Sequence, residues 1–120
     1  MFKSKFATIT AIFLMLSMTD VAAGQYDGLY YPEGMNSTCD PNMIGSDGGP
    51  LLIRKNRIRG VESFCRLKNP TTVRGMNATL FDEECSGEGE TWSSRTMFMW
   101  SDQGLYKIGD GFTVHYLRCK

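Results

Sequence analysis

The carboxylates grouped in one part of this 120-residue chain are the first candidates for chemistry. Asp82–Glu84, Glu88 and Glu90 surround two glycines, an arrangement that could hold calcium or, across a cleft, cleave a glycoside. The run lacks the D-x-D-x-D-G order of an EF-hand loop, and a domain this small rarely forms a sugar-sized cleft. We therefore interpret it as a solvated acidic turn.

The single histidine, His115, could act as a general base. It alternates with Val114 and Tyr116 in an expected strand, so its side chain should point away from the core into solvent. A second stretch, Gly45–Leu51, resembles the Gly-Asp-Ser-Gly-Gly-Pro segment around the nucleophile of trypsin-like proteases, but Asp47 occupies the position of the serine. We therefore expect no enzyme and no cofactor.

The cysteines are four in number and widely spaced, which is typical of disulfides in a small exported protein. They are Cys39, Cys65, Cys85 and Cys119. Zinc sites use close pairs such as C-x₂-C, and these cysteines form none, so we expect no metal. Four cysteines allow three pairings, and the sequence leaves the choice open. If strands alternate up and down, Cys39, Cys65 and Cys119 fall at one end and Cys85 at the other, so one placement must be wrong for both bridges to form. We expect that the long loop carrying Cys39 crosses the barrel.

Basic residues gather at the tip of an expected hairpin. They are Arg54, Lys55, Arg57 and Arg59, with Asn56 at the turn. Such a tip suits an anionic envelope component or an acidic protein partner. The alternative is a charged turn that only keeps the protein in solution.

The first 23 residues have the pattern of a cleavable signal peptide. Lys3 and Lys5 precede the apolar run Phe6–Met18, and Val21–Ala23 offers small residues for cleavage. The run is shorter than the roughly 20 residues of a membrane-spanning helix. We expect an N-terminal signal helix, export, and a periplasmic or secreted protein without a transmembrane segment.

Residues 24–120 are expected to form a single β-rich domain. The signal removes Lys3, Lys5 and Asp20 from the 13 basic and 13 acidic residues, which leaves 11 and 12. A net charge of −1 gives no overall field for nucleic acid. Asn36 and Asn77 begin N-glycosylation patterns, which act only in a eukaryotic secretory pathway.

Short apolar runs separated by glycine, proline and asparagine predict strands rather than helices. The expected strands are Gly28–Tyr31, Leu51–Arg54, Ile58–Leu67, Thr72–Phe81, Thr91–Trp100, Leu105–Ile108 and Phe112–Arg118. Trp92, Phe98 and Trp100 share one parity, as do Phe112, Val114 and Tyr116, so we expect the aromatic residues of both sets in the core. Short connections favour an antiparallel meander of about seven or eight strands, closed into a barrel or folded as a sandwich.

Several short segments together resemble a loose group of small exported bacterial proteins of unknown function. They are the Gly-x-Tyr-Tyr-Pro opening at Gly28–Pro32, Glu62–Cys65, Cys85–Gly89 and Tyr116–Cys119. The resemblance implies a periplasmic β domain and no active-site residue. We expect a non-catalytic binding or inhibitor module. The alternatives are a structural envelope protein without a specific ligand and a small carboxylate-dependent hydrolase.

Overall fold

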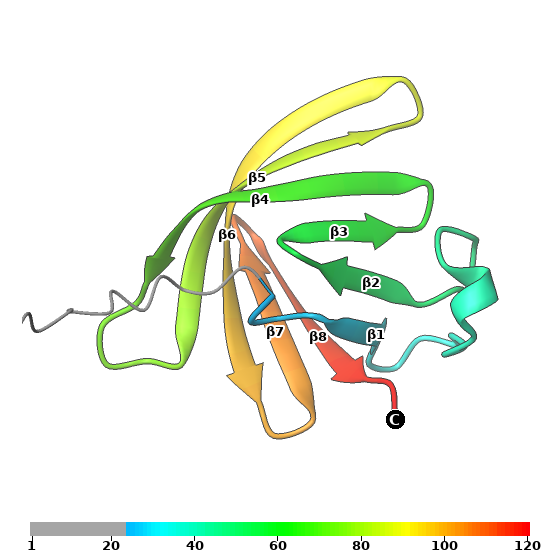
Figure 1. Ribbon diagram of the computed structural model, residues 1–120, viewed down its shortest axis with the longest axis horizontal. Coiled ribbons are helices and arrows are strands. Elements are labelled where there is room, and N and C mark those ends of the chain that lie inside the picture. Colours follow the sequence, from blue (N-terminus) through cyan, green and yellow to red (C-terminus); the bar gives the residue numbers. More distant parts are fainter. Residues whose placement is uncertain (1–23) are drawn as a thin grey trace, which may run out of the picture.

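Eight antiparallel strands form a closed barrel in the computed structural model, which describes residues 24–120 (Figure 1). They are β1 (Gly28–Pro32), β2 (Leu51–Arg54), β3 (Arg57–Gly60), β4 (Ser63–Thr72), β5 (Ala78–Gly87), β6 (Glu90–Ser101), β7 (Gly104–Gly109) and β8 (Phe112–Arg118), with one 3₁₀ turn, η1 (Pro41–Met43). The predicted all-β barrel is confirmed. The predicted signal peptide, residues 1–23, lies outside the described residues. Within residues 24–120 the structure has no helix with the length and apolar character needed to cross a bilayer.

Each strand pairs with the next along the chain, and β1 closes the barrel by pairing with β8. Closure pairs β1 with β8, which covers the two edges that an open sheet would leave exposed there. A two-residue connection joins β2 to β3 through Lys55 and Asn56, whose φ angles are 49° and 59°. Two left-handed residues make the type I′ turn that matches the twist of a hairpin. Asn adopts this conformation readily, whereas Lys does not.

The barrel core is built on aromatic rings from its N-terminal half and from the long strands β5 and β6. Tyr26, which precedes β1, is buried against Phe81 and Phe98, with ring centroids 6.0 and 5.3 Å away. Its hydroxyl hydrogen-bonds to Thr79 Oγ1 (2.9 Å) and to the Phe98 carbonyl oxygen (3.1 Å). Burial raises the pKa of Tyr26. Tyr26 therefore closes one end of the barrel with both its ring and its hydroxyl.

Of the five aromatics expected in the core, Phe98 is buried and Trp100 and Tyr116 pack against the core, but Trp92 and Phe112 are each 45% exposed. The face of β6 was predicted correctly, and the burial of Trp92 and Phe112 was wrong. The pairing of β6 with β7 begins only at Met97, opposite Ile108. Trp92 therefore lies on a part of β6 that has β5 as its only neighbour, beyond the closed part of the barrel.

Two predicted breaks lie inside strands. The acidic segment 82–90 was expected to be a turn, but most of it belongs to β5, and only Glu88 and Gly89 connect β5 to β6. Pro70 falls between the expected strands Ile58–Leu67 and Thr72–Phe81, but it lies within β4 at a register shift between Lys68 and Thr71. A bulge leaves a residue outside the ladder, so it tolerates the missing N–H of proline. The segment expected as one strand, Ile58–Leu67, is split between β3 and β4.

Both predicted disulfides are present, and all four cysteines are paired. Cys65 and Cys85 lie directly opposite each other on β4 and β5, and their bond faces the interior. The bond between Cys39 and Cys119 ties the long β1–β2 connection to the residue after β8. The misplaced cysteine was Cys85, which was expected in a turn at the far end but lies within β5 opposite Cys65. Two disulfides are typical of oxidising compartments outside the cytoplasm.

This pairing predicts a simple peptide map. Digestion of the unreduced protein should yield Cys39-containing peptides joined to Cys119 and Cys65-containing peptides joined to Cys85. Mass spectrometry before and after reduction checks the pairing. A cross-linked peptide containing Cys39 and Cys65 would contradict the described fold.

Candidate functional site

The basic residues singled out in the sequence lie together on the outer face of β2, β3 and β4. Register pairs Arg54 with Arg57 across β2 and β3, and Arg57 with Arg66 across β3 and β4. Arg59 lies beside Leu52 on one side and Phe64 on the other. We call this surface the cationic face, and it consists of Leu52, Arg54, Lys55, Arg57, Arg59, Phe64 and Arg66. Arg66 was not part of the predicted cluster, although it belongs to Ile58–Leu67, the expected second strand of the hairpin.

The five basic side chains of the cationic face are all exposed, and within residues 24–120 none of them forms an ion pair. Glu84 lies opposite Arg66 in the register, but its carboxylate pairs with Lys68 at 2.9 Å instead. Like charges placed directly opposite each other destabilise a sheet. The cationic face therefore concentrates positive charge that the fold itself does not neutralise.

The cationic face is also hollowed. A groove of about 330 Å³ runs over β2 and β3, with Leu52 and Phe64 between the basic side chains. The Arg66 guanidinium lies 6.0 Å from the centre of the Phe64 ring. Arginines held against an apolar surface keep their donors directed outward for carboxylate or phosphate oxygens. This geometry suits an anion with an apolar or flat part.

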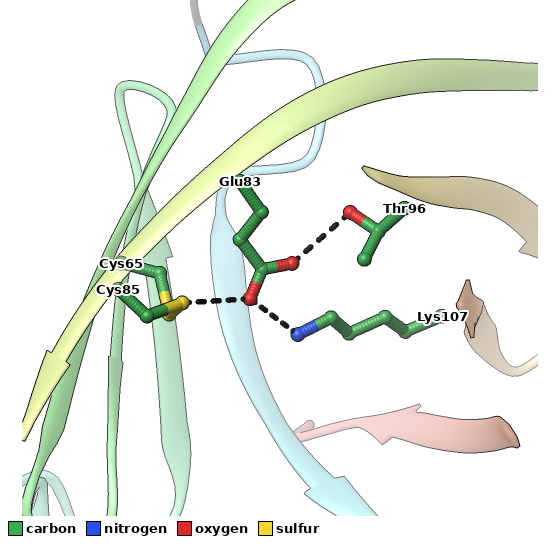
Figure 2. The surroundings of a disulfide bond; sticks show 5 residues. All are labelled: Cys65, Glu83, Cys85, Thr96 and Lys107. Atoms are coloured by element: carbon green, nitrogen blue, oxygen red, sulfur yellow. Dashed lines mark hydrogen bonds and ion pairs between the residues drawn. A yellow bond between two sulfur atoms is a disulfide. The ribbon is translucent and has the colours of Figure 1, made fainter. Parts of the chain in front are cut away.

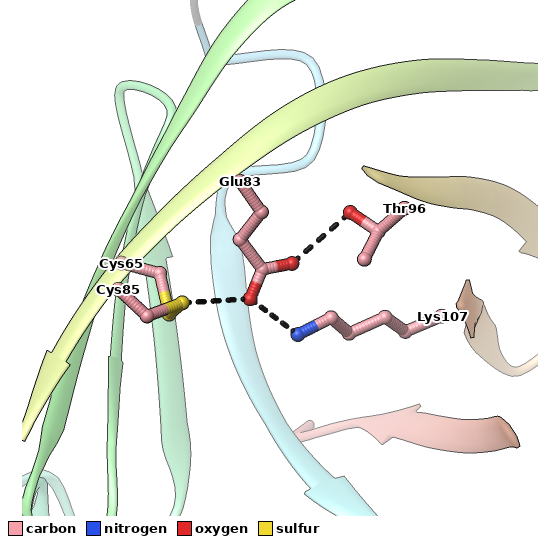
Figure 3. Close-up of polar contacts among 5 residues, drawn as sticks. All are labelled: Cys65, Glu83, Cys85, Thr96 and Lys107. Carbon is pink, nitrogen blue, oxygen red and sulfur yellow. Dashed lines mark hydrogen bonds and ion pairs between the residues drawn. A yellow bond between two sulfur atoms is a disulfide. The ribbon is translucent and has the colours of Figure 1, made fainter. Parts of the chain in front are cut away.

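A buried ion pair lies inside the barrel. Its carboxylate belongs to the acidic segment that was expected to be a solvated turn. Glu83 is 3% exposed, and its Oε1 lies 2.7 Å from the ammonium nitrogen of Lys107 on β7 (Figure 2). Thr96 donates to the other carboxylate oxygen at 3.0 Å (Figure 3). Glu83 follows Phe81 by two positions and Lys107 follows Leu105 by two, so each faces inward with its buried neighbour. Period-2 parity was the signal that could have found this pair.

The same carboxylate lies beside the Cys65–Cys85 disulfide, with Glu83 Oε1 3.0 Å from Cys85 Sγ. A disulfide sulfur has no proton to donate, so this is a close contact rather than a hydrogen bond. Cys65, Glu83 and Cys85 also have the spacing of a metal site, with ligand atoms within 4.8 Å of one another. Metals bind the thiolate, and both sulfurs are used in the S–S bond. The cluster is therefore a structural unit of the barrel interior.

The mouth of the barrel above this ion pair is a shallow cavity of about 320 Å³. Leu51, Ile58 and Tyr116 line it on one side, and Trp92 lies at its edge. Lys107 and Glu83 lie at its floor, where each neutralises the other. Because the pair is already satisfied, the mouth offers less unneutralised charge than the cationic face.

His115 is on the outer face of β8, as its parity predicted, because its neighbour Tyr116 packs against the core. The expectation of a solvated side chain is wrong. The imidazole is only 15% exposed, since it stacks on Tyr106 with ring centroids 4.1 Å apart. Gly45–Leu51, which resembles a protease segment, forms turns and the start of β2.

Comparison with known proteins gives no match to a family model, to a curated protein or to a solved structure.

Proposed function

We propose that this barrel is a periplasmic or secreted binding or inhibitor module whose cationic face holds an anionic partner. The observation that carries the proposal is the group of five exposed basic side chains without an internal ion pair. The described chain is near neutral overall, so this charge is a local feature rather than part of a general field. Binding there requires no reaction and no cofactor.

The geometry favours an extended anionic polymer of the cell envelope over a compact anion. The basic residues are spread across three adjacent strands and a turn, so one phosphate or carboxylate cannot contact them all. A chain of repeated anions could contact several at once and release the counterions held near it. The resemblance to small exported bacterial proteins agrees with such a partner, and it stays a prediction.

Backbone geometry at the hairpin tip also supports a binding role. Lys55 holds a left-handed conformation that costs a non-glycine residue on the order of 1–2 kcal/mol. The Asp27 carboxylate accepts a hydrogen bond from the backbone N–H of Lys55 at 2.8 Å, which stabilises the turn from outside the hairpin. Glycine or asparagine would fit this position with less strain. Lys55 at this position adds one more cation to the cationic face.

Charge reversal at the centre of the cationic face should abolish polymer binding. The test uses Arg57→Glu/Arg59→Glu and measures affinity for a polyphosphate chain by titration at two salt concentrations. We expect at least about a tenfold loss, because attraction becomes repulsion at the contact. Affinity of the unmodified protein should fall with added salt, since exposed charges are screened over roughly 10 Å at 0.1 M.

The matched control is Arg74→Glu/Arg95→Glu, which makes the same change in net charge at exposed positions outside the cationic face. It should retain affinity within about twofold, as expected for charges that do not contact the bound polymer. Equal losses in the two double variants would show a general charge effect and contradict the proposal. Absence of polyphosphate binding by the unmodified protein would also contradict it and would favour an acidic protein as the partner.

A further inference from the structure

On another part of the barrel wall, the side chain of a histidine contacts a glutamate through one ring nitrogen and a serine through the other. Glu33 Oε2 lies 2.7 Å from His115 Nδ1, and Ser101 Oγ lies 2.7 Å from His115 Nε2. An ionised carboxylate only accepts, so it holds the proton of a neutral imidazole on Nδ1. Nε2 is then free to accept the proton of the serine hydroxyl. The two ring nitrogens have the roles that they have in a catalytic triad.

The elements around His115 fix its ring from two sides. The backbone N–H of Glu33 donates to the His115 carbonyl oxygen at 2.9 Å, which ties the end of β1 to β8. The Tyr106 ring stacks on the imidazole with an interplanar angle of 14°. The side chain therefore keeps one plane, directed along the barrel wall toward Ser101.

A glycine lies on β7, the strand between those of His115 and Ser101. Gly104 on β7 pairs with Ser101 on one side and with Leu117 on the other. A Cβ at Gly104 would lie 2.0 Å from the Tyr116 carbonyl oxygen, so no other residue fits the backbone there. Gly104 has no side chain, and the His115 imidazole reaches across β7 to the Ser101 hydroxyl.

The serine lines a surface hollow with a volume of about 560 Å³. Tyr31, Trp100 and Leu117 give it apolar walls, and Arg118 and Lys120 add positive charge. The Arg118 guanidinium lies over the Trp100 ring, 5.2 Å from its centre. An acyl group next to Ser101 would have an apolar surface to contact, and Asp102 and Lys120 are among the charged residues that line the hollow.

From this geometry we infer that Ser101 is a nucleophile for small carboxylic esters, with His115 as its general base and Glu33 as the residue that positions the imidazole. Ser101 Oγ attacks the ester carbonyl carbon while its proton passes to His115 Nε2. The C–O bond to the alcohol breaks, and the alcohol leaves with that proton. Water then attacks the acyl-serine through the same base, which releases the acid and restores the hydroxyl. Lys120, which lines the hollow, is the candidate to stabilise the oxyanion.

This activity goes beyond the proposed binding function and uses none of the residues of the cationic face. It contradicts the expectation that the chain is not an enzyme. Esterase activity and polyphosphate binding can therefore fail or succeed independently, each with its own variants.

The test is covalent labelling of the oxidised protein with an alkyl fluorophosphonate, which the serine attacks at phosphorus with loss of fluoride. Mass spectrometry should find the adduct on Ser101. Ser101→Ala should remove it, and His115→Gln should slow labelling by at least about 100-fold, as for loss of a general base. Glu33→Gln should slow it less. Hydrolysis of 4-nitrophenyl acetate should follow the same order.

Ser93→Ala is the matched control, because Ser93 is an exposed serine on the same strand. It should be labelled at the unmodified rate. Thermal unfolding of each variant separates loss of the nucleophile from loss of the fold. Failure of the unmodified protein to react, an adduct elsewhere than Ser101, or equal rates in folded His115→Gln and unmodified protein would each overturn the inference.

Discussion

Lys107→Met should lower the free energy of unfolding by about 3–5 kcal/mol, the usual cost of removing one partner of a buried ion pair. The substitution leaves the Glu83 carboxylate 3% exposed and without its cation. Thr96 still donates one hydrogen bond, but a hydroxyl dipole cannot replace a full charge. In a domain with about 5–15 kcal/mol of stability, the loss should be plain in a urea titration.

Two further variants test this explanation. Lys68→Met removes an ion pair of similar length at the surface, where both partners are about half exposed, and should cost less than about 1 kcal/mol. Glu83→Met combined with Lys107→Met removes both charges and should recover much of the single-variant loss. If Lys107→Met and Lys68→Met cost the same, the interior pair contributes no more than a surface pair.

Phe98→Ala should cost about 3–5 kcal/mol through lost burial and the cavity left behind. The ring is 1% exposed and makes edge contacts with Tyr26 and Phe81, whose centroids lie 5.3 and 5.4 Å away. Strands hold these neighbours in place, so the surroundings can collapse only in part. Denaturant titration of the purified, oxidised variant measures the loss.

Trp92→Ala is the informative comparison, because Trp92 shares the inward face of β6 with Phe98 but is 45% exposed. Its loss should be well under half of that for Phe98→Ala. A Trp92→Ala loss as large as that of Phe98→Ala would mean that the β5–β6 hairpin is covered by packing that the described fold does not contain.

Local sequence patterns were sufficient to predict the barrel and most of its strands. Alternation identified the inward faces of β6 and β8, and the Lys55–Arg57 segment marked the hairpin turn. Alternation says which way a side chain points, but not where a neighbouring strand ends. Trp92 was therefore placed on the correct face with the wrong burial, because the end of β7 is a property of the whole sheet.

The polar interior was missed for a different reason. Glu83 lies within a run of acidic residues, and the run was interpreted by composition rather than by alternation. Composition predicts solvent exposure for a carboxylate, since burial of an unpaired charge is costly. The partner that makes burial possible, Lys107, lies 24 positions away on another strand. Only the register of the closed sheet brings the two together.

The candidate sites differ in the same way. The cationic face was predictable because a hairpin brings residues close in sequence onto one surface, and only Arg66 was missed. The Glu33–His115–Ser101 series was not, although the outward direction of His115 was. Glu33 is 82 positions from His115, and its approach depends on the pairing of β1 with β8 that closes the barrel.

The bond between Cys39 and Cys119 makes a covalent ring of every residue between them, which includes all strands from β2 to β8. A protease that cuts one exposed turn within that ring opens it without releasing a fragment. The two new ends stay attached through the disulfide, and the barrel can remain assembled around the cut. Proteases are common outside the cytoplasm, and no new protein is made there. A molecule closed by this disulfide survives a single cleavage within the ring as one piece.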